Sequence, residues 1–479
     1  MNPALIGSLI AGYFLILMAV AWLTGRKASN ASFFLGNRRS PWYVVSIGMI
    51  GSSLSGVTFI SVPGWVQNQQ FTYLQMVAGF VLGYIVIANI LLPLYYRLNL
   101  TSIYSYLQER FGLYTYKSGA LLFIASRTVG SAARLYLMAS VLQLAIFDAL
   151  GVPFIVTVTL AILLIWLYTF KGGVGTIIWT DALQTLLMLS AVGITIYHVA
   201  TSLQLSPSGL VQTIADSELS RIFVWDNWKA PNHFIKQFFA GAFITIVMTG
   251  LDQDMMQKNL SCKTLRESQK NMYWYGIAFL PVNLLFMSLG VLLFTFVARE
   301  GLPLPERADD LYPMLALGGH LPAAVGIFFI LGLVAAAYSS ADSALTALTT
   351  SFSIDILRID KMPETKAKRL RTLSHIGFSL LTALVILIFR WLNKDSIIDT
   401  IYTLAGYTYG PLLGFYAFGL FTRMRIHDKL VPLAALLPPV LTGILDFNAY
   451  NWFGFHLGYE KLILNGALTF LTLLLLRKK

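Results

Sequence analysis

The chain has 479 residues, of which 57% are hydrophobic and only 12% are charged, and its mean hydropathy is +0.69. Soluble domains carry about 25% charged residues, so these charges are too few to cover a globule of this size in water. A net charge of +12 would suggest nucleic acid as a partner of a soluble protein, but here the basic residues fall in short loops between apolar runs. We therefore expect an all-α integral membrane protein that is surrounded by the lipid bilayer and has no nucleic acid partner.

The apolar runs predict thirteen membrane spans, because a helix needs about 20 mostly apolar residues to cross the hydrocarbon core. The expected spans cover residues 5–24, 41–66, 72–98, 118–148, 152–170, 174–200, 234–250, 271–298, 321–354, 372–392, 397–421, 430–446 and 460–476. The first run has no basic segment before it and no clear cleavage site after it. We expect it to be retained as a span and not removed as a signal peptide.

Basic clusters follow the odd-numbered spans. They are Arg26, Lys27, Arg38 and Arg39; Arg97, Arg110 and Lys117; Lys171; Lys258, Lys263, Arg266 and Lys270; Arg358, Lys361, Lys366, Lys368, Arg369 and Arg371; Arg423, Arg425 and Lys429; and Arg477, Lys478 and Lys479. The connections after even-numbered spans are short or carry mixed and acidic charge. Because cytoplasmic loops are enriched in Lys and Arg, this alternation predicts an outside N-terminus and a cytoplasmic C-terminus.

Spans two to six and seven to eleven form two blocks of five. An odd-numbered block enters the membrane with the opposite sense, as in transporters built from inverted repeats, whose sites lie at broken helices. The expected parts of a single transmembrane transporter domain, 1–479, are an extra N-terminal helix and loop (1–40), a first repeat (41–233), a second repeat (234–425) and two C-terminal helices (426–479). Small and polar residues in spans two and seven favour such breaks, although they also suit close helix packing.

Span nine carries a polar stretch. Ala336, Ser339, Ser340 and Ser343 are spaced to share one helix face, and Asp342 neighbours Ser339. A carboxylate in mid-membrane costs about 2.5–3.5 kcal/mol on the insertion scale, and a bound cation would offset this cost. Oxygen donors suit Na⁺ better than a soft metal. The structural alternative is a network in which the hydroxyls bond back to helix carbonyls and Asp342 pairs with a base.

Three other charged residues of the predicted spans are candidates for the site. Asp181 in span six could complete an oxygen cage with span nine, or could sit at the membrane interface in the first turn of its helix. Arg127 and Arg134 in span four are seven residues apart and lie on roughly one face. They could meet an anionic substrate or pair with Asp342 or Asp181, or one of them could snorkel to the interface.

Four segments together resemble the sodium/solute symporter family, which includes bacterial proline, sialic acid and sugar transporters and the animal sodium/glucose cotransporters. They are Ser52-Ser53-Leu54-Ser55-Gly56; Gly172-Gly173 with Trp179-Thr180-Asp181 and Gln184; Asp252-Gln253-Asp254-Met255-Met256-Gln257-Lys258, close to a DQxxxQR pattern; and Ala336-Ala337-Tyr338-Ser339-Ser340-Ala341-Asp342-Ser343, leading to Asp355. The resemblance covers spans one to eleven. It implies a LeuT-type fold of about thirteen helices with two inverted five-helix repeats.

The resemblance also implies ligands for Na⁺. A first site would use the carbonyls of Gly51, Leu54 and Ala336 and the hydroxyls of Ser339 and Ser340. A second site, found in some relatives, would match Asp181, Ser339, Asp342 and Ser343. The position of Asp342 is often neutral in relatives, so this carboxylate could strengthen cation binding or carry a proton.

The implied substrate pocket lies between spans two, three, four, seven and eleven. Its residues would be Ser52, Ser53, Ser55, Thr58, Arg127, Arg134, Thr245, Met248 and Thr249. We expect a Na⁺-coupled secondary active symporter, and not an enzyme, that imports a small organic solute by alternating access and needs no cofactor besides Na⁺ as coupling ion. We expect a monomer in the plasma membrane, the inner membrane of a bacterium. The alternatives are an ion channel and a membrane-embedded solute sensor.

Overall fold

The computed structural model describes residues 3–24, 30–148, 150–392 and 397–478. The predicted loop cations Arg26 and Lys27 lie outside these residues. The described chain is helical, with two isolated β-bridges, Ser40 to Cys262 and Ile426 to Arg477. The helices to residue 220 are α1 Pro3–Thr24, α2 Asn30–Leu35, η1 Gly36–Arg38, α3 Trp42–Gln69, α4 Tyr73–Val86, η2 Ile87–Leu91, α5 Leu92–Arg97, α6 Ser105–Arg110, α7 Leu113–Leu142, η3 Gln143–Phe147, α8 Phe154–Gly172, α9 Val174–Ser202, α10 Pro207–Ala215 and η4 Glu218–Ser220.

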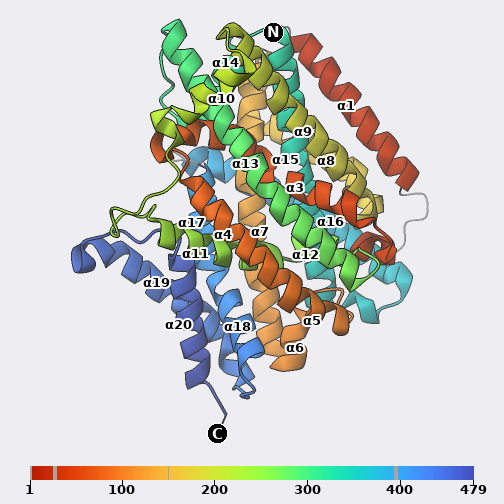
Figure 1. The fold of residues 1–479 in the computed structure, drawn as a ribbon. Helices are drawn as coiled ribbons and strands as arrows, with labels where there is room; N and C mark the ends of the chain where they lie inside the picture. The colour runs from red at the N-terminus through yellow and green to blue at the C-terminus, as the bar shows by residue number, and fades with distance from the viewer. Residues whose placement is uncertain (1–2, 25–29, 149, 393–396, 479) are drawn as a thin grey trace.

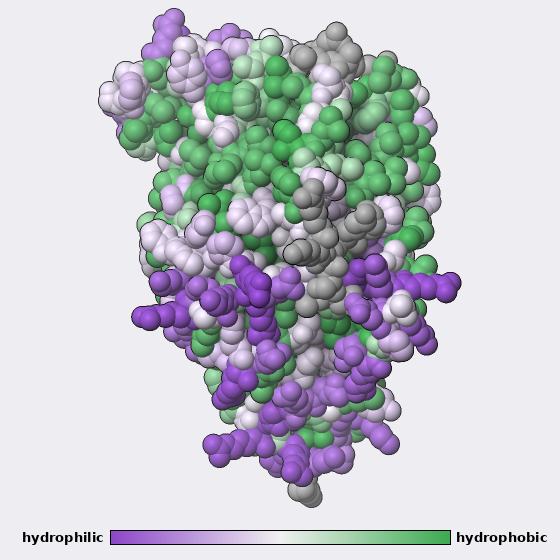
Figure 2. Space-filling model, turned by 90° about the vertical axis from the view of Figure 1, so that its right-hand side faces the viewer, coloured by the Kyte–Doolittle hydropathy of each residue, from purple (hydrophilic) through white to green (hydrophobic). Residues whose placement is uncertain are grey.

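The remaining helices complete a bundle with the N-terminal end at one pole and the C-terminal end at the other (Figure 1). They are α11 Phe234–Thr245, η5 Ile246–Gly250, α12 Gln253–Asn259, α13 Leu265–Glu300, η6 Ala308–Asp310, α14 Leu311–Leu317, α15 Ala323–Ser351, η7 Phe352–Ile356, η8 Ile359–Lys361, α16 Glu364–Leu392, α17 Ile397–Thr408, α18 Gly410–Phe421, η9 Asp428–Leu430, α19 Val431–Phe453 and α20 Lys461–Leu475. The face in Figure 2 shows a hydrophobic zone with hydrophilic residues at both ends of the molecule, and this arrangement fits a membrane protein.

Each of the thirteen predicted ranges contains helix. By length and apolar composition alone, eight helices of the described chain could cross a membrane, or nine if α11 to α12 counts as one bent span. Predicted span eleven differs from expectation, since it forms two helices, α17 and α18, that meet at Tyr409. Pro411 lies in the first turn of α18, where its missing N–H costs no helix bond, so this sequence favours a new helix start.

α3 is the central element, and it is broken. It packs against α9, α13 and α15, and nearly all of its span is buried, whereas α1 lies on the outside. Ser55 inside α3 has φ 52° and ψ 173°, which is not helical, so the helix is interrupted there. The Val57 amide donates to the Ser55 hydroxyl at 3.3 Å, which caps the second half. A break in the hydrogen-bond ladder leaves carbonyls of the preceding turn available to a ligand.

The helix that starts the second predicted block is broken as well. α11 runs into the π-helical turn η5, and α12 follows at an angle of 70° after Gly250. The Asp252 carboxylate caps α12 by accepting the amides of Asp254 at 2.9 Å and Met255 at 3.3 Å. The expected irregularity of spans two and seven is therefore present in both helices.

Candidate functional site

The polar stretch of α15 is fully inside the protein. Ser339, Ser340, Asp342 and Ser343 are all buried, and α15 packs against both α3 and α9 at this level. Buried polar groups need partners, since leaving them unpaired costs about 1–3 kcal/mol each. The partners come from α3, α8, α9 and α15 itself.

Asp181 of α9 accepts hydrogen bonds from hydroxyl groups on both neighbouring helices, α3 and α15. Its carboxylate accepts the hydroxyls of Ser339 at 2.6 Å and of Ser343 at 3.3 Å from α15. Ser52 of α3 donates to it at 2.9 Å. Asp181 is fully buried in the interior of α9, so the alternative of an acid at the membrane interface is wrong. We call Asp181, Asp342 and the hydroxyls of Ser52, Ser339 and Ser343 the carboxylate cage.

Asp342 forms the other side of the carboxylate cage. One of its oxygens accepts the Tyr168 hydroxyl of α8 at 2.8 Å, and the other lies 3.2 Å from the Ser343 hydroxyl. The structure thus brings together the residues expected for a second cation site, Asp181, Ser339, Asp342 and Ser343. Among the described residues, no basic side chain lies within ion-pair distance of Asp342.

Lys258 also belongs to this cluster, which the sequence analysis did not predict. It was expected in a cytoplasmic loop, and this expectation is wrong, because α12 turns into the protein and buries Lys258. Its Nζ lies 2.8 Å from Asp181 Oδ2 and 2.5 Å from Ser52 Oγ, and 3.8 Å from Asp254 Oδ1 on its own helix. The signal in the sequence was the i, i+4 spacing of Asp254 and Lys258, which places both on one helix face.

The break in α3 lies against the polar stretch of α15. A Cβ built on Gly56 would lie 3.4 Å from the Cβ of Ala337, and the Ser52 and Ser339 hydroxyls are 3.2 Å apart. On the opposite side of α3, Gly51 permits α9 to approach closely, because a Cβ at this position would lie 2.1 Å from Thr185 Oγ1 of α9.

The groups expected for a first Na⁺ site therefore come from two touching elements. Gly51 and Leu54 belong to α3, and Ala336, Ser339 and Ser340 belong to α15; all five are buried. The Ser340 hydroxyl donates to the Ala337 carbonyl at 3.1 Å. Carbonyl and hydroxyl oxygens are hard ligands that fit Na⁺.

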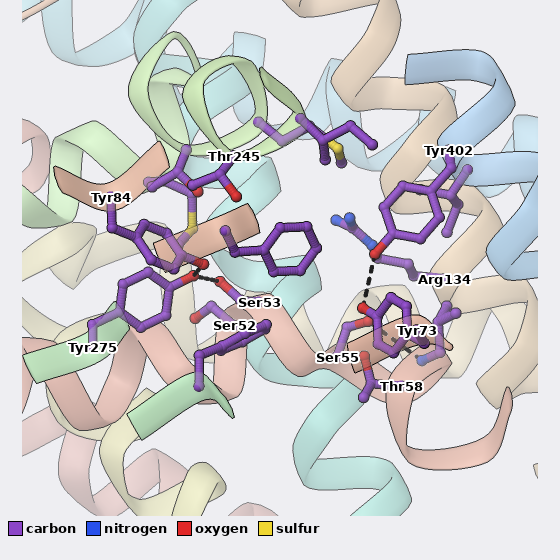
Figure 3. A pocket seen from close by; sticks show the side chains of 18 of the residues that line it. Ser52, Ser53, Ser55, Thr58, Tyr73, Tyr84, Arg134, Thr245, Tyr275 and Tyr402 are labelled. Carbon is purple, nitrogen blue, oxygen red and sulfur yellow. Dashed lines mark hydrogen bonds between the residues drawn. The ribbon is translucent and has the colours of Figure 1, made fainter. Parts of the chain in front are cut away.

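A cavity lies on the other side of the broken segment of α3, and every predicted substrate residue lines it (Figure 3). These residues are Ser52, Ser53, Ser55, Thr58, Arg127, Arg134, Thr245, Met248 and Thr249. They come from α3, α7, α11 and η5. Ser52 both lines this cavity and donates to Asp181, so the cavity borders the carboxylate cage.

The two arginines of α7 have different surroundings. Arg127 pairs with Asp254 and lies 3.7 Å from Asp252 Oδ2, so for Arg127 the alternative of pairing with Asp342 or Asp181 is wrong. Arg134 has no carboxylate within ion-pair distance in the described part of the chain. Both are buried, so snorkelling to the interface is wrong too. Figure 3 shows Arg134 beside Tyr402.

The sequence analysis missed the aromatic part of the cavity wall. The missed residues are Tyr73, Phe80, Tyr84, Tyr275, Phe279 and Tyr402. The hydroxyls of Tyr73 on α4 and Tyr402 on α17 are 3.0 Å apart, and Tyr275 of α13 bonds Ser53 at 2.5 Å and Tyr84 at 2.9 Å (Figure 3). With 14% aromatic residues along the whole chain, no pattern marked these positions.

Comparisons with known proteins agree on one family. The model of the Sodium:solute symporter family matches residues 33–427. The Sodium/sialic acid symporter NanT of Aliivibrio fischeri is 27% identical over 90% of this chain and 85% of its own length. The Sodium/sialic acid symporter SiaT of Proteus mirabilis is 23% identical over 96% of this chain and 94% of its own. The human Sodium/iodide cotransporter is 26% identical over 82% and 62%.

Solved structures show the same fold. The substrate-bound outward-open state of a Na⁺-coupled sialic acid symporter superposes with a TM-score of 0.83 at 19% identity, covering 98% of this chain and 97% of that one. Mhp1, a nucleobase-cation-symport-1 family transporter in a closed conformation, gives a TM-score of 0.55 at 15% identity, covering 93% and 94%. These likenesses establish the fold alone.

Proposed function

The chain belongs to the sodium:solute symporter family and is a Na⁺-coupled symporter with a LeuT-type fold, and we propose that it imports a small organic anion. In this proposal, Na⁺ binds between α3 and α15, and Arg134 holds the acidic group of the solute in the adjacent cavity. The observation that carries the proposal is a buried arginine in the cavity wall with no carboxylate partner among the described residues.

The first Na⁺ site would use the carbonyls of Gly51, Leu54 and Ala336 and the hydroxyls of Ser339 and Ser340. Three observations support it: the interrupted helix at Ser55, the contact of α3 with α15, and the burial of every proposed ligand. A buried oxygen site without a cation would leave acceptors unpaired, which is costly in a membrane protein.

An anionic solute is supported by the charges around the cavity. Arg127 already contacts Asp252 and Asp254, so, among the cavity residues that the structure describes, Arg134 is the cation that remains for a ligand. A guanidinium binds a carboxylate through two parallel hydrogen bonds. The relatives reported above that are named for sialic acid and for iodide carry the names of anions, which supports an anionic solute.

Transport by alternating access would use the two breaks. The half-helices of α3 and the α11–α12 pair meet near the cavity, and a change of angle at Ser55 or Gly250 would open one side and close the other. Na⁺ favours one state only if it binds that state more tightly, so the ligands contributed by both α3 and α15 would be assembled in one state and separated in the other.

We also propose the topology and assembly. The inverted repeats would cover 41–233 and 234–425, flanked by 1–40 and 426–479. The N-terminus would lie outside and the C-terminus in the cytoplasm of a bacterial cell, with the monomer in the inner membrane as the working unit. The bacterial sialic acid symporters among the relatives support the inner membrane. A carrier family does not favour the channel, sensor or enzyme alternatives.

Uptake into proteoliposomes tests the proposal. The solutes are sialic acid and short monocarboxylates, each paired with its uncharged methyl ester, with an inward gradient of Na⁺ or of K⁺. We expect uptake of an acid, but not of its ester, only with Na⁺. Ser340→Ala and Arg134→Met should abolish this uptake, and Arg134→Lys should retain part of it. Uptake that is indifferent to Na⁺, or equal for acid and ester, would contradict the proposal.

A further inference from the structure

The carboxylate cage already contains a cation supplied by the chain. The Lys258 ammonium lies 2.8 Å from Asp181 Oδ2 and 2.5 Å from the Ser52 hydroxyl. Both of these oxygen atoms belong to the carboxylate cage. The Ser343 hydroxyl donates to the same Asp181 oxygen at 3.3 Å. An ammonium and a Na⁺ both seek such donors, so the two compete for the same place.

Lys258 is held there by its helix. α12 is short and buried throughout, and it is fixed by the Asp252 cap at its start and by the Tyr409 hydroxyl, which donates to Asp252 at 2.6 Å. Arg127 pairs with Asp254 and lies 3.7 Å from Asp252. Lys258 lies 3.8 Å from Asp254 but only 2.8 Å from Asp181, so Asp181 is its main partner. A lysine buried in this way without a carboxylate would be strongly unfavourable, so the pair is expected to stay together.

The charges of the carboxylate cage then leave room for one more cation. Asp181 and Asp342 carry two negative charges when ionised, and Lys258 supplies one positive charge. The proposed first Na⁺ site shares Ser339 with the cage and consists of uncharged oxygens. A single Na⁺ at that site would therefore complete the charge balance with Asp342.

We infer that Lys258 is the resident cation of the carboxylate cage, so that this chain binds one Na⁺ where a cage without the lysine would allow two. The number one rests on the proposed first Na⁺ site, whereas the blocking of the second place by Lys258 does not. Lys258 also follows the bend at Gly250, so a change in this angle would move its ammonium relative to Asp181 of α9.

Equilibrium binding of radioactive Na⁺ to the purified, detergent-solubilised full chain tests the inference without a solute. The wild type is expected to bind one Na⁺. Lys258→Gln, which removes the charge and keeps a polar side chain, is expected to bind two. Lys258→Arg should bind the wild-type number. Lys263→Gln, an identical charge change at an exposed position a few residues away, should also leave it unchanged.

Ser340→Ala separates this inference from the proposed first site. Alone it should abolish binding, and in combination with Lys258→Gln it should leave one Na⁺. If Ser340→Ala has no effect but Lys258→Gln still adds one ion, the first site is wrong and the role of Lys258 stands. A wild type that binds two Na⁺, or a folded Lys258→Gln variant that gains none, would overturn the inference. A wild-type count of two overturns the inference even if Lys258→Gln fails to fold, and Lys258→Met then provides a second neutral variant whose expected count is two.

Discussion

Asp342 stands next to two groups of different character. One is Asp181 of α9, which is already paired with Lys258. The other is the row of hydroxyl side chains on its own helix, α15, that begins at Ser339. Tyr168 and Ser343 supply its hydrogen bonds, but no basic side chain of the described chain pairs with it. Its charge is therefore available to attract a cation that binds nearby without contacting it.

Asp342→Asn should weaken Na⁺ binding without removing a proposed ligand of the first site. Two unit charges at an effective dielectric constant of about 20 interact by about 4 kcal/mol at 4 Å, and this energy is inversely proportional to the distance between them. We therefore expect the Na⁺ concentration for half-maximal binding to rise by about tenfold or more, since 1.4 kcal/mol corresponds to tenfold.

The measurement is the Na⁺ dependence of the melting temperature, which follows binding by mass action. Asp360→Asn makes the same change at an exposed position and is the matched control. An unchanged Na⁺ dependence in Asp342→Asn would mean that this carboxylate is neutral in the native protein or plays no part in ion binding.

The sequence was sufficient to predict the position of Ser339 within its helix face, but not the position of Lys258. Helical spacing was enough to place Ser339, Ser340 and Ser343 on one face, because that relation is local. Lys258 was grouped with the loop cations that follow it, since hydropathy cannot reveal that a 70° bend returns α12 to the interior. Arg127 was likewise separated from its partners Asp252 and Asp254 by more than a hundred residues.

At the scale of elements, the breaks were easier to predict than the packing around them. Small and polar residues in spans two and seven indicated weak helices, and both helices are interrupted. The alternative reading, that small residues permit close packing, also applies. In the described structure, Gly79 of α4 lies against the backbone of α11, and Gly241 of α11 lies against the backbone of α4. Small residues thus mark a helix break in one place and close helix packing in another, and only the three-dimensional structure tells which applies.

Gly79→Ala and Gly241→Ala should each destabilise the pair α4–α11, which forms one wall of the cavity. A Cβ at Gly79 would lie 2.0 Å from the Phe238 carbonyl oxygen, and one at Gly241 would lie 2.2 Å from that of Met76. Because backbone atoms cannot rotate away, the helices must separate, and overpacking of this kind costs about 1–3 kcal/mol.

The matched control is Gly193→Ala in α9, where a Cβ would meet nothing within 4 Å. It should be neutral or stabilising, since alanine favours a helix by up to about 1 kcal/mol over glycine. Melting temperatures in detergent compare the three variants. Equal melting temperatures for Gly79→Ala, Gly241→Ala and Gly193→Ala would contradict the close approach of α4 and α11.

At the scale of the whole molecule, hydrophilic residues gather on the end of the molecule that carries the C-terminus, below the hydrophobic zone (Figures 1 and 2). The alternation of basic clusters assigns that end to the cytoplasm. The described residues agree in exposure, since Lys366 is exposed in the first turn of α16 and Asp216 is exposed directly after α10. The direction of insertion, however, depends on the membrane, which no contact within the chain reports.

Cys262 makes this direction measurable. It is the only cysteine of the chain and is buried in the turn between α12 and α13, where burial raises the pKa of its thiol to about 12. The thiolate is the reactive form, so Cys262 should resist maleimides until the protein unfolds. The wild type is therefore a silent background for single cysteines placed at exposed positions.

In intact cells, a membrane-impermeant maleimide should label Asp216→Cys at once and Lys366→Cys only after permeabilisation, with no labelling of the wild type in either case. The reason is that residue 216 lies in a connection with acidic charge, predicted outside, whereas residue 366, in the first turn of α16, belongs to the largest basic cluster, predicted in the cytoplasm. The reverse pattern would place the N-terminus inside and invert every connection. Labelling of both variants from outside would mean that an odd number of crossings between α10 and α16 has been miscounted.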